Sequence, residues 1–94
     1  MYLNLNTRAL PSAILITLDA SPIGQAFVVN AVTAPPHAPE WARWLEEIGF
    51  IAGEPVMLMA RSMPGGDPLM VRVGLSTFAL RRAEAACVTV EAAA

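Results

Sequence analysis

His37, the only histidine in this 94-residue sequence, stands three positions before Glu40, so an imidazole and a carboxylate could share one metal ion. A structural or transport site for a transition metal needs three or four ligands in matched geometry, and these two residues supply only part of that set. We therefore expect at most a weak surface site at His37 and Glu40, open to an adventitious ion such as zinc. No cofactor is expected to be required. The alternative is that His37 is simply solvated.

The sequence offers little for catalysis. Its serines are Ser12, Ser21, Ser62 and Ser76. His37 lies in the proline-rich run 34–39, outside any motif in which a histidine activates a nucleophile. The eight carboxylates show no pairing that would place a general acid and a general base in one predicted pocket. These observations favour a protein that is not an enzyme.

The methionines suggest a different chemistry, adaptable apolar contact with a partner. From Pro55 onward apolar residues recur with a period of two, which predicts strands over 55–61 and 69–73 joined by a turn at 63–66. If Val56, Leu58, Leu69, Val71 and Val73 face a core, the opposite face carries Met57, Met59, Met70, Arg61 and Arg72. Methionine where a solvated strand normally carries charge is typical of a protein-recognition surface. We expect this patch to bind a partner; the alternative is that the helix or the N-terminal segment covers it.

The remaining elements must position these candidates. A further strand is predicted over 26–32, a single helical turn near 17–20 and another at 82–85, and short strands around Phe78 to Leu80 and Val88 to Val90. Gly74 is expected where the sheet must bend. Together these elements predict a mainly β fold, a small SH3-like β-barrel of five to six short strands with one inserted amphipathic helix and a short helical turn.

The inserted helix is predicted to begin near Pro39 and to end at Gly49. Its apolar face consists of Trp41, Trp44, Leu45 and Ile48. This spacing of three and four residues is typical of a helix that packs one side against a core. Trp44 is expected in the core, whereas the pattern leaves Trp41 open between core and interface.

Arg81 and Arg82 are adjacent and precede a turn, where two cations could bind a phosphate. Arg81 also stands three residues before Glu84, a spacing that allows a weak surface pair across the turn. We favour the pair over the phosphate site.

The composition limits the kinds of partner and the cellular compartment to be expected. The net charge is −2, which gives no electrostatic reason to expect nucleic acid or an anionic membrane as the partner. The single cysteine, Cys87, excludes an internal disulfide and a cysteine-based zinc site, and a reducing compartment is the simpler setting. The apolar run 13–18 is far shorter than the roughly 20 residues of a membrane helix. We expect a cytoplasmic protein without direct membrane insertion.

Two stretches resemble the FeoA family of bacterial ferrous iron transport accessories: "LEEIGFIAGEPVMLM", residues 45–59, and "GDPLMVRVGLSTFALRRAEAACVTVE", residues 66–91. The residues that match the family pattern are Ile48-Gly49-Phe50, Gly53, Val56, Gly66-Asp67-Pro68, Val71, Val73, Phe78-Ala79-Leu80-Arg81, Glu84-Ala85 and Val90. The resemblance covers about residues 18 to 91. Ala52 stands where the family usually has proline and Phe78 where it has leucine, and the first dozen residues are extra.

The resemblance implies an SH3-like barrel at residues 17–94, preceded by an N-terminal extension at residues 1–16. It implies a non-enzymatic accessory that docks on the cytoplasmic, G-protein-containing part of a FeoB-type transporter, and so lies peripheral to the inner membrane through that partner. A weak homodimer is the other association expected. The alternative function is a regulatory SH3-like domain that acts with a metal-dependent repressor of the DtxR class. The negative net charge and the lack of a helix-turn-helix pattern in the sequence argue against direct DNA binding.

Overall fold

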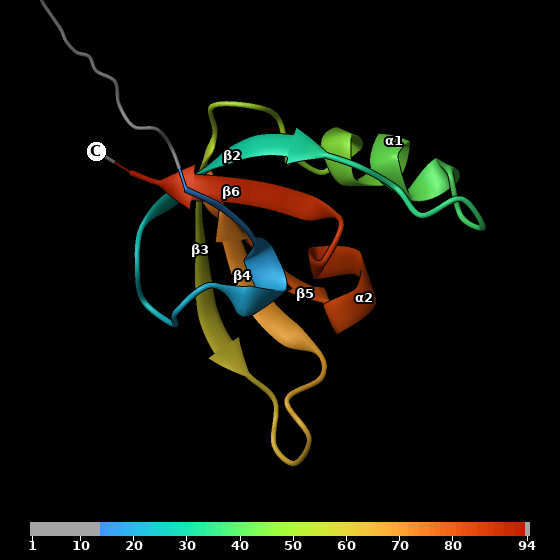
Figure 1. The fold of residues 1–94 in the computed structure, drawn as a ribbon. Coiled ribbons are helices and arrows are strands. Elements are labelled where there is room, and N and C mark those ends of the chain that lie inside the picture. Colours follow the sequence, from blue (N-terminus) through green and yellow to red (C-terminus); the bar gives the residue numbers. More distant parts are fainter. Residues whose placement is uncertain (1–13, 94) are drawn as a thin grey trace, which may run out of the picture.

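The computed structural model describes residues 14–93, which form one antiparallel sheet and three short helical elements (Figure 1). The strands are β1 (Leu15–Thr17), β2 (Phe27–Val32), β3 (Pro55–Arg61), β4 (Leu69–Val73), β5 (Ser76–Leu80) and β6 (Val88–Ala92). The helical elements are the 3₁₀ turn η1 (Leu18–Ala20), the helix α1 (Glu40–Glu47) and the short helix α2 (Arg82–Ala85). The predicted mainly β class, with one longer helix and short helical turns, is confirmed.

The six strands lie in the order β1-β6-β2-β3-β4-β5, so among the described residues the first strand pairs with the last. Strands β3, β4 and β5 form a meander, and β4 and β5 are joined by the two residues Gly74 and Leu75. Gly74 has φ +58°, the left-handed conformation that tight hairpin turns demand and that glycine adopts without steric cost. Within the described residues β1 and β5 are the two edges of the curved sheet.

β1 was not predicted as a strand, because residues 1–16 were assigned to an extension. Ile16 pairs with Val90 and Thr17 with Thr89, so β1 runs across the proposed boundary between residues 16 and 17. The division of the chain at that point stays a prediction. Most of the predicted extension lies outside the described residues.

The core lies on the inner face of the sheet, which we define as the face that carries Leu58, Leu69 and Val71. The five side chains predicted to face the core are all buried: Val56, Leu58, Leu69, Val71 and Val73. Leu80, Val88 and Val90, on the other predicted strands, are buried as well, and Phe78 is half-buried and packs against the same cluster. Strand alternation read from the sequence therefore gives the correct inner face for most of the sheet.

A β-bulge at Met59 interrupts that alternation. Leu58 pairs with Val71, but the next pair along the strands is Ala60 with Met70. Met59 is therefore an extra residue in β3 that has no partner of its own in β4. After the bulge Ala60 faces outward and Arg61 lies opposite the buried Leu69. The prediction that Arg61 lies on the face opposite the core is therefore wrong, because one extra residue in a strand moves every later side chain to the other face.

α1 ends as the sequence predicts. Gly49 has φ +125°, its N–H donates to the carbonyl of Glu46, and the N–H of Phe50 donates to the carbonyl of Leu45. These two bonds form a Schellman motif, which satisfies carbonyls that the last turn would leave unpaired. The turn brings Phe50 back into the core, where it is fully buried.

The expected burial of Trp44 is wrong: its side chain is 39% exposed, whereas Leu45 is fully buried. Trp41 and Ile48 are half-buried and pack against the core. Successive helical residues are about 100° apart around the helix axis. Trp41 and Ile48 therefore lie about 40° and 60° from the direction of Leu45, whereas Trp44 lies about 100° from it. With Leu45 at the centre of contact, Trp44 falls at the edge of the buried stripe.

Candidate partner-binding surface

The outer face of β3, β4 and β5, opposite the core, is almost free of charge. We call this surface the outer face; its residues are Pro55, Met57, Met59, Ala60, Met70, Arg72, Thr77 and Ala79. Arg72 is its only charged residue. Antiparallel sheets with one solvated face usually alternate apolar and polar residues, so an apolar solvated face indicates contact with something else.

The methionines of this face are open to solvent. Met59 is 41% exposed and Met70 is 37% exposed, while Met57 is half-buried. Because of the bulge, Met70 lies opposite Ala60 and diagonal to Met59, rather than opposite Met59 as the simple alternation suggests. Neither a helix nor another described segment covers Met59 and Met70. The binding of a partner by these methionines stays a prediction.

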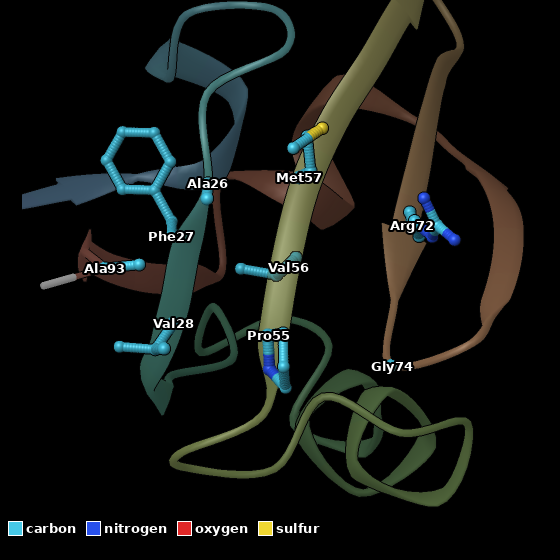
Figure 2. Close-up of a pocket in the computed structure, with 9 residues that line it drawn as sticks. All are labelled: Ala26, Phe27, Val28, Pro55, Val56, Met57, Arg72, Gly74 and Ala93. Atoms are coloured by element: carbon cyan, nitrogen blue, oxygen red, sulfur yellow. The ribbon is translucent and has the colours of Figure 1, made fainter.

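A hollow of about 330 Å³ continues the outer face toward β2 (Figure 2). It forms where β2 and β3 share only two residue pairs, Phe27 with Val56 and Val28 with Pro55. Nine residues line it: Ala26, Phe27, Val28, Pro55, Val56, Met57, Arg72, Gly74 and Ala93. The lining is apolar except for Arg72. Nothing in the sequence pattern predicts this hollow, because it depends on the short pairing between two strands that are distant in the chain.

Arg72 is exposed at the edge of this hollow. Its guanidinium makes no hydrogen bond or ion pair with residues 14–93. The carboxylate of Glu54 lies beside Gly74, at one end of the hollow, and also forms no ion pair with Arg72. The hollow therefore combines apolar walls with one cation that is available to a ligand.

Arg61 does not belong to this surface. Its guanidinium donates to the carbonyls of Asp19 at 3.0 Å and Ser21 at 3.3 Å. These carbonyls lie at the end of η1, and a cation there satisfies the acceptors that a helical turn leaves open. Arg61, which the sequence places with the methionines, instead fixes η1 to β3.

His37 and Glu40 are both exposed; Glu40 is the first residue of α1 and His37 precedes it by three positions. The His37 ring contacts the Trp41 ring edge-on, with centroids 6.1 Å apart and an interplanar angle of 71°. Across residues 14–93 no group of three or more His, Cys, Asp or Glu residues is placed to hold a metal ion. The weak site expected at His37 and Glu40 stays a prediction.

His37 also lines a second apolar hollow, of about 520 Å³, together with Trp41 and Cys87. The Cys87 thiol is buried and donates a hydrogen bond to the carbonyl of Ala83 at 3.4 Å. Burial, and to a lesser extent the negative charge of Glu84, raises the pKa of the Cys87 thiol. A thiol held in its neutral form is a poor nucleophile, so this cysteine is a packing residue.

Two carboxylates cap the start of α2. Oε1 of Glu84 accepts a hydrogen bond from the N–H of Arg81 at 2.8 Å, and Oδ1 of Asp67 accepts one from the N–H of Arg82 at 3.0 Å. Glu84 thus bonds to the main chain of Arg81, where a side-chain pair was expected. The sequence offered no local signal for the cap by Asp67, because the two residues are 15 positions apart.

No helix within residues 14–93 is long and apolar enough to cross a membrane.

The fold defines a small SH3-like domain. The crystal structure of Stenotrophomonas maltophilia FeoA complexed with zinc, a prokaryotic SH3 domain protein, matches with a TM-score of 0.72 and 41% identity, over 80% of this chain and 88% of that chain. The family model for the FeoA domain matches residues 16–92. This chain belongs to the FeoA family, and the SH3-like fold implied by the resemblance is confirmed.

Other comparisons agree on the fold. The solution structure of Chlorobium tepidum FeoA matches with a TM-score of 0.69 and 29% identity, over 84% of this chain and 71% of that chain. A manganese-dependent transcriptional repressor matches with a TM-score of 0.73 and 20% identity, over 89% of this chain and 45% of that chain, a likeness that concerns the fold alone. A search of curated proteins gives no match to this sequence.

Proposed function

We propose that this protein is a non-enzymatic accessory of ferrous iron transport that docks through its outer face on the cytoplasmic part of a FeoB-type transporter. Membership of the FeoA family supports the link to ferrous iron transport. The protein then acts in the cytoplasm, and reaches the inner membrane only through its partner. It needs no cofactor for this role.

The observation that carries the docking surface is the exposure of Met59 and Met70 on a face whose only charge is Arg72. Methionine side chains are unbranched and polarizable, so they fit partner surfaces of irregular shape. Met57 and Arg72 extend the same surface into the hollow beside β2. We assign docking to Met57, Met59, Met70 and Arg72, and not to Arg61, whose guanidinium is bonded to carbonyls at the end of η1.

The test is co-purification of this protein with the soluble G-domain-containing part of the transporter. Met59→Lys combined with Met70→Glu places charge on the outer face and should abolish association. The thermal midpoint should change little, because both side chains already contact solvent.

Met63→Lys combined with Leu75→Glu is the matched control. These two side chains are 88% and 97% exposed in the turns that follow β3 and β4, and neither is among the residues that define the outer face or line the hollow. The control should associate as the wild type does. Undiminished association of the Met59 and Met70 variant would reject the outer face as the docking surface, and a large fall in its thermal midpoint would show that the methionines contribute to folding instead.

A further inference from the structure

We infer that the hollow beside β2 is a pocket for an apolar segment of a partner protein that carries one carboxylate, and that this carboxylate pairs with Arg72. The inference deepens the proposed function, since it rests on the outer face being a docking surface and adds the chemistry of the segment that docks.

The walls of the hollow define the apolar part of the ligand. Val28 from β2, Pro55 and Met57 from β3, and Ala93 after β6 contribute aliphatic surface around about 330 Å³ (Figure 2). This volume is at the lower end of the range for small ligand sites, about 300–1,000 Å³, and is enough for a few side chains but not for a helix. The hollow continues into the methionine surface, so one extended segment could occupy both.

Arg72 defines the charge of the ligand. A partner that covers the outer face removes water from the guanidinium, and the burial of an arginine without a counter-charge is strongly unfavourable. The partner must therefore supply an anion. Arg72 is the only charged residue among the lining residues, so a single negative charge balances it, whereas a phosphate dianion would leave an excess beside the Glu54 carboxylate at one end of the hollow. One carboxylate, from Asp, Glu or a chain terminus, meets this requirement.

Two other occupants fit the charge less well. The chain's own residues 1–13 contain Arg8 but no Asp or Glu, so they would bring positive charge to Arg72. A second copy of this protein would have to place its own Arg72 near the first in a symmetric contact through this face, which like-charge repulsion disfavours.

The experiment is an NMR titration of the full-length, ¹⁵N-labelled protein with three capped peptides, acetyl-Leu-Leu-Glu-Leu-amide and its Gln and Lys counterparts. The Glu peptide should shift the amide signals of Val28, Met57 and Arg72, and it should bind about tenfold more tightly than the Gln peptide, a difference of about 1.4 kcal/mol. The Lys peptide should bind most weakly. Because no transporter is present, a failure here is distinguishable from a failure of the docking experiment.

Arg72→Gln should remove the preference for the Glu peptide while the shifts caused by the Gln peptide remain. Arg43→Gln, which removes the same charge from the exposed side of α1, should keep the preference. Equal affinities of the Glu and Gln peptides for the wild type, shifts confined to another surface, or no shifts at millimolar peptide would each overturn the inference.

The same samples test the other occupants. Tyr2 is the only tyrosine, so its ring protons can be followed individually. Nuclear Overhauser contacts from the Tyr2 ring to the methyl groups of Val28 or Met57 would place the chain's own N-terminal segment in the hollow and overturn the inference. Shifts of the hollow residues on dilution, without peptide, would indicate a second copy and would overturn it as well.

Discussion

The main-chain N–H of Arg82 donates a hydrogen bond to Oδ1 of Asp67, 3.0 Å away, and so joins the loop before β4 to the start of α2. In the sequence Asp67 belongs to a Gly-Asp-Pro motif that carries part of the family resemblance. In the structure it has a plain physical role, because a carboxylate at a helix N-terminus satisfies an unpaired N–H and interacts favourably with the helix dipole.

Asp67→Ala should lower the free energy of unfolding by about 1 kcal/mol, the usual cost of losing a side-chain cap. Asp67→Asn keeps an acceptor oxygen and should lose less. Urea denaturation measures both, with Glu46→Ala on the exposed side of α1 as the control. Equal stability of the Asp67→Ala variant and the wild type would show that the bond contributes nothing in solution.

Val71→Ala should lower the free energy of unfolding by about 1–3 kcal/mol. Val71 is fully buried on β4, between its neighbours Leu58 on β3 and Phe78 on β5. Removal of its two methyl groups leaves a cavity that the paired strands cannot close. Thermal or urea unfolding measures the change, and Thr77→Ala on the exposed face of β5 is the control. A cost similar to that of Thr77→Ala would contradict the assignment of the inner face.

Stability should fall at alkaline pH because of Cys87. Burial, and next the charge of Glu84, raises the pKa of its thiol, so folding favours the neutral form. The contribution of this group to stability is fully present below the ordinary thiol pKa and is lost as the pH rises through the higher pKa of the folded state. The wild type should lose more stability over this interval than Cys87→Ala, and equal losses would refute the argument.

The same burial should slow the reaction of Cys87 with a disulfide reagent. At neutral pH the native protein should react at least about tenfold more slowly than the protein in urea, because only the exposed thiolate is a nucleophile. The absorbance of the released thiolate reports the rate directly. Equal rates in the two states would show that the thiol is accessible in the fold.

Zinc should bind weakly, and through His37. The His37 imidazole and the Glu40 carboxylate together offer an ion only two protein ligands. Calorimetry should therefore give a Kd above about 1 µM. His37→Ala should abolish the binding and Glu40→Gln should weaken it. Submicromolar binding by a monomer would mean that a third and a fourth ligand exist, and would refute the two-ligand site.

The sequence predicts the inner face well because that signal is local. Strands 55–61 and 69–73 have in the structure the bounds predicted for them, since alternation with a period of two can be read from a few consecutive residues. The end of α1 at Gly49 is predictable for the same reason. The apolar helix stripe is also local, but the exposure of Trp44 depends on which of its residues lies at the centre of contact, and this the helical spacing alone does not say.

The features that the sequence did not predict depend on the pairing of segments that are distant in the chain. The bulge at Met59 exists only in the register between β3 and β4, and it is this register that sends Arg61 to η1. The hollow depends on how briefly β2 pairs with β3, and β1 depends on its pairing with β6 at the other end of the chain. Such registers are set by tertiary packing, so the methionines could be predicted as a surface while its shape could not.

The bulge also sets a length. Beyond Met59 the strand turns its next charged side chain, Arg61, to the inner face, and the apolar path along β3 is limited to the stretch from Pro55 to Ala60. At about 3.3 Å per residue this is a path of roughly 17 Å. A partner segment that follows β3 therefore has room for about five extended residues before it reaches the turn after Arg61, which favours recognition of a short linear stretch over the broad face of a folded domain.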